Sequence, residues 1–280
     1  MSKFIITFLS DFGYRAESAG VCRAVIKSLA PEVEVLDLCH GLPPFDVRAG
    51  ALALENAVPF CPLGVHLAVV DPGVGGPRRP VALQAARGDF LVGPDNGLLI
   101  PAARRLGGIT RAHLLENPEH MLHPVSATFH GRDLFAPAAA FLARGGRLEE
   151  LGRALSPEEL APAPWGEPAL LGEEVAGEVL GYDQYGSLKL NLRPEHLQAL
   201  GLQPGELVLF KAGAAGDREY SWTLPFVRTF GDVPPGQPCL LTDSDGRLAV
   251  AVNLGSARSL LGLAAGAPVR CRRPADAPAP

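Results

Sequence analysis

The sequence predicts an α/β protein: an N-terminal domain built on a helix-covered, mostly parallel sheet, and a smaller C-terminal all-β barrel or sandwich. Apolar runs of strand length alternate with helical periodicity in the first half of the chain. Beyond a proline-rich stretch, short apolar runs separated by Gly, Pro and Asp turns replace that alternation. We expect the α/β domain at residues 1–155, a linker at 156–170, the β domain at 171–274 and a disordered tail at 275–280.

The elements of both domains follow from local patterns. Helical periodicity covers residues 19–29 and stops before Pro31, and Asp46 can cap a helix over 47–57. A later helix is expected over 134–143. Strands of the first domain are expected at residues 4–9, 33–38, 65–70, 81–85 and 90–92. Strands of the second are expected at residues 175–182, 188–192, 207–210, 221–226, 239–242 and 248–252.

The composition argues against several classes of protein. A net charge of −5 without a Lys/Arg cluster argues against nucleic acid as a partner. No apolar run reaches the ~18–20 residues that span a bilayer, so no membrane partner is expected. The chain starts in a strand-like run rather than a signal peptide, and its five cysteines are odd in number and lack CxxC spacing. We therefore expect a cytoplasmic protein with buried thiols and no metal site.

The most informative motif lies where the apolar run 65–70 ends. Asp71 directly follows this run and begins a Gly/Pro-rich turn. Arg78 follows at the end of that turn. Open α/β sheets bind ligands at the carboxyl ends of their strands. Asp11 ends the first expected strand in the same way, and His130 lies in a later Phe-His-Gly-Arg-Asp stretch. A fold that brings Asp71, Arg78 and His130 together would suit chemistry on water.

The residues by themselves leave structural interpretations open. Asp71-Pro-Gly can be only a turn, and Asp11 can merely cap one. Arg78 can be a surface arginine like Arg79, and the residues do not choose between the two. A structural histidine is the better interpretation of His130 on its own.

Other motifs are equally ambiguous. Asp95-Asn96-Gly97 resembles a turn that starts a helix, although Asp95 or Asn96 could also support a site from behind. Tyr185 and Phe230 could be core aromatics or a platform for a purine.

Five stretches, in order along nearly the whole chain, resemble the S-adenosyl-L-methionine hydrolases that form adenosine, also called SAM hydroxide adenosyltransferases. They are residues 10–13 (SDFG), 70–75 (VDPGVG) followed by Arg78, 93–99 (GPDNGLL), 129–133 (FHGRD) and 182–187 (YDQYGS). The resemblance implies hydrolysis of S-adenosyl-L-methionine to adenosine and L-methionine by in-line attack of an activated water or hydroxide on ribose C5′. Because the sulfonium lets methionine leave as a neutral thioether, no metal, cofactor or general acid is required.

The resemblance also implies roles for residues of the first domain. Asp71, Arg78 and His130 match a water-activating triad, in which the carboxylate accepts or orients a proton of the water. Asp11 matches an acid that binds the ribose hydroxyls. Phe45 stands where the related halogenating enzymes carry a tryptophan against the ribose.

In the second domain, the resemblance implies the contacts with adenine and methionine. Asp183 matches an acid that meets the methionine ammonium, and Ser244 matches a serine near its carboxylate. Tyr185 and Phe230 would sandwich the adenine. The remaining expected adenine contacts are Ser187, where the family usually has asparagine, and the backbone near Val252 and Leu254. The family is similar in forming homotrimers, with each site between the first domain of one subunit and the second domain of the next.

Two further positions depart from the family's pattern. Ala16 replaces an acid, beside Glu17, and Asp245 stands at the position of the halogenases' arginine near the carboxylate.

Two other functions compete with hydrolysis. The fluorinating and chlorinating enzymes that act on the same substrate are similar in fold, so one alternative is a halogenase. Asp71 and His130 oppose it, because an anionic side chain beside the nucleophile site repels halide. The other alternative, a non-enzymatic adenosine- or S-adenosyl-L-methionine-binding protein, would not need the triad.

Overall fold

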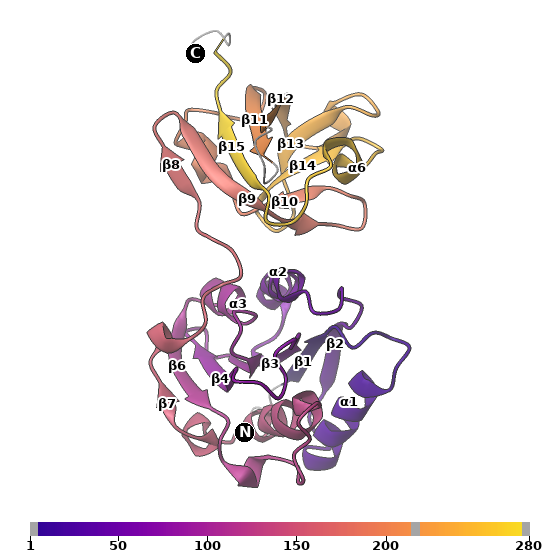
Figure 1. Cartoon of the computed structure of the whole chain (residues 1–280), viewed down its shortest axis with the longest axis vertical. Helices are drawn as coiled ribbons and strands as arrows, with labels where there is room; N and C mark the ends of the chain where they lie inside the picture. The colour runs from indigo at the N-terminus through magenta and orange to yellow at the C-terminus, as the bar shows by residue number, and fades with distance from the viewer. Residues whose placement is uncertain (1–4, 214–218, 276–280) are drawn as a thin grey trace. The chain divides into compact units, whose positions relative to one another are not determined.

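The computed structural model describes residues 5–213 and 219–275, so the tail expected at 275–280 lies, apart from residue 275, outside the described residues. The chain divides into two compact units, Met1–Pro164 and Trp165–Pro280 (Figure 1). Within the described ranges, no helix is long and apolar enough to cross a membrane.

A seven-stranded sheet forms the centre of the first unit, in the order β2-β1-β3-β5-β4-β6-β7. The strands are β1 (Ile5–Ser10), β2 (Val35–Cys39), β3 (Gly64–Val69), β4 (Pro80–Ala85), β5 (Phe90–Pro94), β6 (Ile109–Leu114) and β7 (Ala154–Leu155). The first four in this order pair in parallel. The remaining pairs are antiparallel, and the connection 86–89 between β4 and β5 is too short for the crossover that parallel neighbours need.

Helices cover both faces of this sheet (Figure 1). α1 (Ser18–Leu29) packs against α4 (Ala136–Ala143), and α2 (Val47–Ala57) packs against α3 (Ile100–Arg105) on the other face. Asp46 caps α2 as predicted, because its carboxylate accepts the Ala49 N–H at 2.9 Å. Nearly every residue of α4 is buried, since α1 covers one side of it and the strands β1 and β3 the other. Single 3₁₀ turns lie at Val58–Phe60, Pro118–His120, Leu148–Leu151 and Pro157–Glu159.

The helix predicted from residue 134 begins earlier, as one wide π-helical turn at Gly131–Phe135, and continues as α4. Pro137 explains the wide turn. It has no N–H to donate to the carbonyl of Asp133, and its ring would clash with that carbonyl in a regular α-helix. The Asp133 carbonyl instead accepts the Leu122 N–H at 2.9 Å. Turns of this kind are frequent at functional sites, and this one directly follows His130.

A buried polar network lies at the amino end of β3. Thr7 Oγ1 is 2.8 Å from His66 Nδ1, and His66 Nε2 is 3.2 Å from Asp89 Oδ1. Arg87 donates to both Asp89 oxygens, at 2.6 and 2.8 Å, and the Gly64 N–H donates to Oδ1 at 3.2 Å. Burial alone would raise the pKa of Asp89, but the hydrogen bonds from Arg87, His66 and Gly64 outweigh burial and hold that pKa below its usual range.

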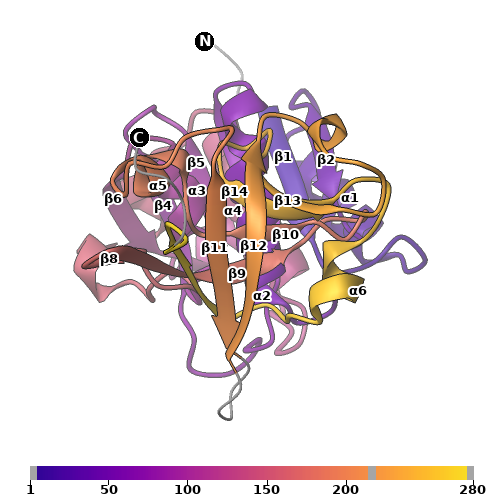
Figure 2. The same cartoon turned by 90° about the horizontal axis from the view of Figure 1, so that it is seen from above.

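The second unit is a closed β-barrel, which decides between the predicted barrel and sandwich. Its strands are β8 (Ala169–Leu171), β9 (Glu174–Tyr182), β10 (Leu188–Leu190), β11 (Leu207–Gly213), β12 (Glu219–Val227), β13 (Pro238–Thr242), β14 (Leu248–Val252) and β15 (Pro268–Arg272). The order is β10-β14-β13-β12-β11-β15-β9-β8, and a further β9–β10 pairing closes the ring. Figure 2 shows the antiparallel pair β11 and β12 side by side. A 3₁₀ turn at Phe230–Asp232 and the helices α5 (Pro194–Gln198) and α6 (Ala257–Leu261) complete the unit.

The five cysteines are free thiols. Four are buried as predicted, whereas Cys39, the last residue of β2, is only half-buried. Burial raises the pKa of Cys22 and of Cys271 to about 12, so these two thiols remain protonated and unreactive near neutral pH.

Candidate active site

Three acidic side chains follow parallel strands at one edge of the first sheet. Asp11 comes directly after β1, Asp71 comes shortly after β3, and Asp95 comes directly after β5. Because the carboxyl ends of parallel neighbours meet at the same edge, all three lie where open α/β sheets bind ligands.

Arg78 joins Asp71 to His130 at this edge. Its Nε donates to Asp71 Oδ1 at 2.9 Å and to Oδ2 at 3.0 Å, and its Nη2 also donates to Oδ2. The same Nη2 lies 2.6 Å from His130 Nδ1. The side chains of Arg78 and Asp71 are only 9% and 6% exposed, so water screens this charge-assisted pair little. Arg79 pairs with Asp95 instead, so the structure distinguishes the two neighbouring arginines.

The contact with Arg78 fixes the tautomer of His130. A guanidinium only donates hydrogen bonds, so His130 Nδ1 must accept and the ring proton must lie on Nε2. Burial, and then the charge of Arg78, lower the pKa of His130, against a weaker opposite effect of Asp71 and Asp133. His130 is therefore a neutral imidazole near neutral pH, with Nε2–H as a donor.

The loops that carry these residues are held together by a close backbone approach. Gly75 has a φ of +74°, and a Cβ there would lie 2.3 Å from the Ala127 carbonyl oxygen. Only glycine allows both the conformation and the approach. Beside it, Asp133 Oδ2 accepts the Ser126 N–H at 2.8 Å and Oδ1 accepts from Arg132 at 2.6 Å. Asp133 thus supports the segment before His130.

Asp11 and Phe45 lie together at the same edge. The Phe45 N–H donates to Asp11 Oδ2 at 2.8 Å, while Phe45 as a residue is 72% exposed. Phe45 has a φ of +66°, in the left-handed region that costs a bulky residue of order 1 kcal/mol or more. Within the described ranges, Leu254 is the other non-glycine residue with positive φ, at +51°. Strained backbone of this kind clusters at functional sites, and both residues were expected from the resemblance to contact ligand.

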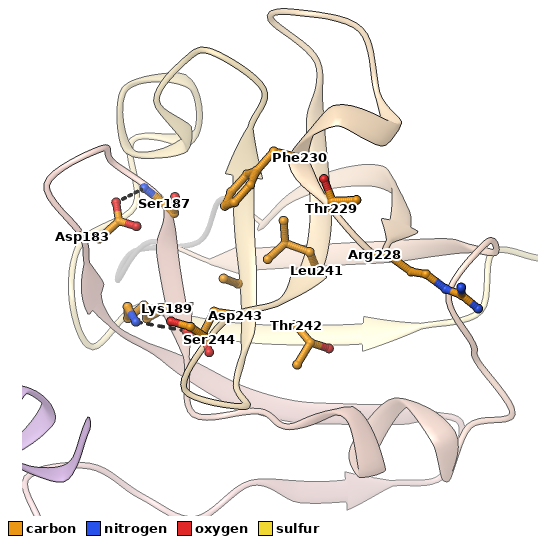
Figure 3. Close-up of a pocket in the computed structure, with 11 residues that line it drawn as sticks. Asp183, Ser187, Lys189, Arg228, Thr229, Phe230, Leu241, Thr242, Asp243 and Ser244 are labelled. Atoms are coloured by element: carbon orange, nitrogen blue, oxygen red, sulfur yellow. Dashed lines mark hydrogen bonds and ion pairs between the residues drawn. The ribbon is translucent and has the colours of Figure 1, made fainter. Parts of the chain in front are cut away.

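The second unit contains a cavity of about 240 Å³ (Figure 3). It is lined by Asp183, Ser187, Lys189, Arg228, Thr229, Phe230, Leu241, Thr242, Asp243, Ser244 and Ala249. Four expected ligand contacts, Asp183, Ser187, Phe230 and Ser244, therefore line one cavity. Asp183 also shapes it, because its Oδ1 accepts the N–H groups of Tyr185 at 2.9 Å and Ser187 at 3.0 Å.

Lys189 is a cavity residue that the sequence did not single out. Its Nζ lies 3.1 Å from Asp243 Oδ2 (Figure 3). The same Nζ also donates to Asp245. Burial alone would lower the pKa of Lys189, but the two carboxylates outweigh burial and raise it. Asp245 thus pairs with a cation of this chain. No pattern in the sequence relates Lys189 to residues more than fifty positions later, so only the fold brings them together.

The other expected adenine contacts of the second unit lie outside that cavity lining. Tyr185 is 73% and Leu254 89% exposed, whereas Val252 is buried at the end of β14. Within the parts of the chain that the structure describes, no group of three or more His, Cys, Asp or Glu side chains is arranged to hold a metal ion.

The fold and the site define a class of protein with two domains, an α/β unit followed by a closed β-barrel. The Asp–Arg–His group at the strand ends of the first unit is suited to a reaction in which water takes part. The chain belongs to the SAM hydroxide adenosyltransferase family. The model of the family's N-terminal domain matches residues 6–152, and that of its C-terminal domain matches residues 177–270.

Relatives and solved structures agree with this assignment. The chain is 44% identical to the (R)-S-adenosyl-L-methionine hydrolase of Salinispora tropica, over 93% of this chain and 95% of that protein. It is 45% identical to the hydrolase of the same name from Thermus thermophilus, over 95% and 98%. A fluorinase of an Actinoplanes species is 30% identical over 89% and 91%. The crystal structure of an uncharacterized conserved protein from Thermotoga maritima superimposes with a TM-score of 0.86 at 34% identity, over 96% and 100%.

Proposed function

We propose that this protein hydrolyses S-adenosyl-L-methionine to adenosine and L-methionine. The observation that carries the proposal is the shielded Asp71–Arg78–His130 group at the strand-end edge of the sheet. The names of the relatives that are 44% and 45% identical support the choice of substrate.

The hydrogen bonds of Asp71 indicate where a water would bind. Oδ2 accepts two bonds from Arg78, whereas Oδ1 accepts one, so Oδ1 retains acceptor capacity for a water proton. Arg78 favours hydroxide by its charge and keeps the carboxylate in place. The water oxygen attacks ribose C5′ as the C5′–S bond breaks, the sulfur takes the bonding pair and leaves as neutral methionine thioether, and the proton passes to Asp71 and then to solvent.

The remaining expected residues would bind the substrate. Asp11 would accept hydrogen bonds from the ribose hydroxyls, with Phe45 against the sugar. In the cavity of the second unit, Asp183 and Ser244 would meet the amino-acid end. The adenine contacts would come from Tyr185, Ser187, Phe230, Val252 and Leu254.

The proposed reaction is tested by incubating the purified protein with S-adenosyl-L-methionine in ¹⁸O-labelled water. We expect adenosine and methionine in equal amounts, with the label in the 5′-hydroxyl of adenosine, and the same rate after dialysis against EDTA. Protein that binds adenosine but releases no adenosine from the substrate would instead support the non-enzymatic alternative.

Chloride and fluoride should not replace water as the nucleophile. A halide ion needs hydrogen-bond donors, whereas Asp71 Oδ1 offers only an acceptor at the proposed water position. We expect saturating chloride or fluoride to give no 5′-halo-5′-deoxyadenosine detectable by mass spectrometry. A halogenated nucleoside at yields comparable to adenosine would contradict the proposal and favour a halogenase.

The pH profile should report the neutral state of His130. Protonation of Nδ1 would remove the acceptor of the Arg78 hydrogen bond. Because the pKa of His130 lies below the ordinary value of about 6.5, the neutral ring persists to lower pH than in an ordinary histidine. We therefore expect kcat to stay level as the pH falls to about 6.5 and to decline only below it. An acid limb centred above that value would argue against a neutral His130.

A homotrimer in the cytoplasm is proposed as the working form. The support is the resemblance to the family and the free state of the five cysteines. Light scattering should give a mass of about 88 kDa for three chains of 29.4 kDa each. A monomer mass at micromolar concentration would end the proposal of a trimer.

A further inference from the structure

The residues that directly follow β5 contact the segment around Asp71 from both ends. At one end, Asn96 Nδ2 donates to the Val70 carbonyl at 2.9 Å, and Val70 directly precedes Asp71. Asn96 Oδ1 accepts the Leu98 N–H at 3.2 Å, which fixes the orientation of the amide. The Asn96 carboxamide thus fixes the backbone at Val70, directly before Asp71.

At the other end of that segment, Asp95 holds Arg79, the residue after Arg78. Arg79 donates to Asp95 Oδ2 from Nε at 2.9 Å and from Nη2 at 2.5 Å. The Asp95 N–H donates back to the Arg79 carbonyl at 2.8 Å. The Asp95 side chain is only 4% exposed. Backbone and side chain therefore fix residue 79 together, which restricts the backbone from which Arg78 projects.

The same residues also anchor the segment that ends the first unit. Asp95 Oδ1 accepts the Ala161 N–H at 2.8 Å, and its arginine partner donates to the Glu159 carbonyl. Gly97 has a φ of +91°, and a Cβ there would lie 2.3 Å from the Pro162 carbonyl oxygen. The two Asp95 oxygens accept hydrogen bonds from different segments, Oδ2 from Arg79 and Oδ1 from Ala161. These bonds hold the Asp95 carboxylate in one position.

We propose that Asp95 and Asn96 are positioning residues that set the place of Asp71 and Arg78 relative to the sheet. The inference rests on the proposed function, because the geometry they maintain is that of the proposed water site. They contact the chain neighbours of the pair, not the pair itself, so their loss would displace the Asp71 carboxylate without removing a reacting group. A displacement of about 1 Å can cost roughly 100-fold in rate.

The first test separates turnover from binding. Asp95→Asn keeps the shape of the side chain but removes its charge and one acceptor atom. We expect kcat to fall by about tenfold or more, while the dissociation constant of adenosine changes by less than about twofold. Glu149→Gln is the matched control, because it removes a carboxylate that pairs with Arg111 at the surface of the same unit. It should leave kcat unchanged.

A second readout reports the geometry without turnover. In the wild type, ¹⁵N NMR should show His130 with its proton on Nε2, and a His130→Ala spectrum assigns the signals. In Asp95→Asn, a displaced Arg78 should no longer fix that tautomer, so the His130 nitrogen shifts should move toward those of a tautomer mixture. Asn96→Ala, which loses the bond to the Val70 carbonyl, should show a smaller change in the same direction.

The outcomes distinguish the inference from the proposed function. If Asp95→Asn does not fold, Arg79→Lys replaces it as the test variant. Lysine keeps the positive charge but cannot make the two-nitrogen contact with Asp95, so we expect the same fall in kcat. Wild-type kcat with unchanged His130 shifts in the folded variant would overturn the positioning role. Absence of adenosine formation by the wild type would instead defeat the proposed function, while the NMR comparison would still decide whether Asp95 positions Arg78.

Discussion

Asp71→Asn should lower the rate of adenosine formation by at least ~100-fold, the scale expected when a general base is lost. The amide keeps the size of the side chain, but it is far less basic and cannot keep the charge-assisted bonds with Arg78. Adenosine affinity should change much less, because the expected adenine and ribose contacts are other residues. Chromatographic initial rates and calorimetric titration with adenosine measure the two quantities.

His130→Ala should lower the rate on the same scale, because Arg78 then loses the acceptor that orients its Nη2. The surface variant Glu149→Gln, at 39% side-chain exposure, provides the control and should retain full activity. If Asp71→Asn retains near-normal turnover, Asp71 is only a turn residue and the proposed mechanism is wrong.

Asp89→Asn should reduce the free energy of unfolding by about 1–3 kcal/mol, the usual cost of leaving buried donors without their acceptor; the Arg87 side chain is 34% exposed, so solvent compensates part of the lost ion pair. The side chain of Asp89 is fully buried, and its two oxygens accept from Arg87, His66 and the Gly64 backbone. An amide leaves the Arg87 charge without its counter-ion and turns an NH₂ group toward donors. Urea denaturation measures the change, and Glu149→Gln, which breaks a surface pair, should cost less than about 1 kcal/mol.

The same network predicts the sign of a pH effect. The pKa of Asp89 is lower in the folded protein than in the unfolded chain. Its stabilisation is therefore complete above the unfolded value of about 3.9 and is lost as the pH falls toward the folded value. In acid, the stability of Asp89→Asn should depend less steeply on pH than that of the wild type. Equal slopes would mean that Asp89 is not the group whose protonation destabilises the fold.

The sequence was most informative where local patterns coincide with function. The runs that became β1, β3 and β14 were predicted within a residue or two, and Asp46 was predicted to cap α2 and does so. Strand β15 was missed, because only two of its five side chains, Val269 and Cys271, are apolar and buried, and two others are arginines. It nevertheless forms part of the barrel, where it pairs with β9 and β11. Four of the five motifs that carried the resemblance lie at or directly after the end of a strand, and the fifth, residues 129–133, leads into the π-helical turn before α4.

The sequence by itself determined the α/β-then-β organisation, because periodicity is a property of the chain, and the resemblance of its motifs to a known family pointed to Asp71, Arg78 and His130 as a group. Only the tertiary structure decided which arginine pairs with Asp71 and which ring nitrogen of His130 accepts its hydrogen bond. It also decided that Lys189 meets Asp243 and Asp245. These outcomes depend on contacts between residues far apart in the chain, whose geometry is set by how strands and loops pack and which no local pattern encodes.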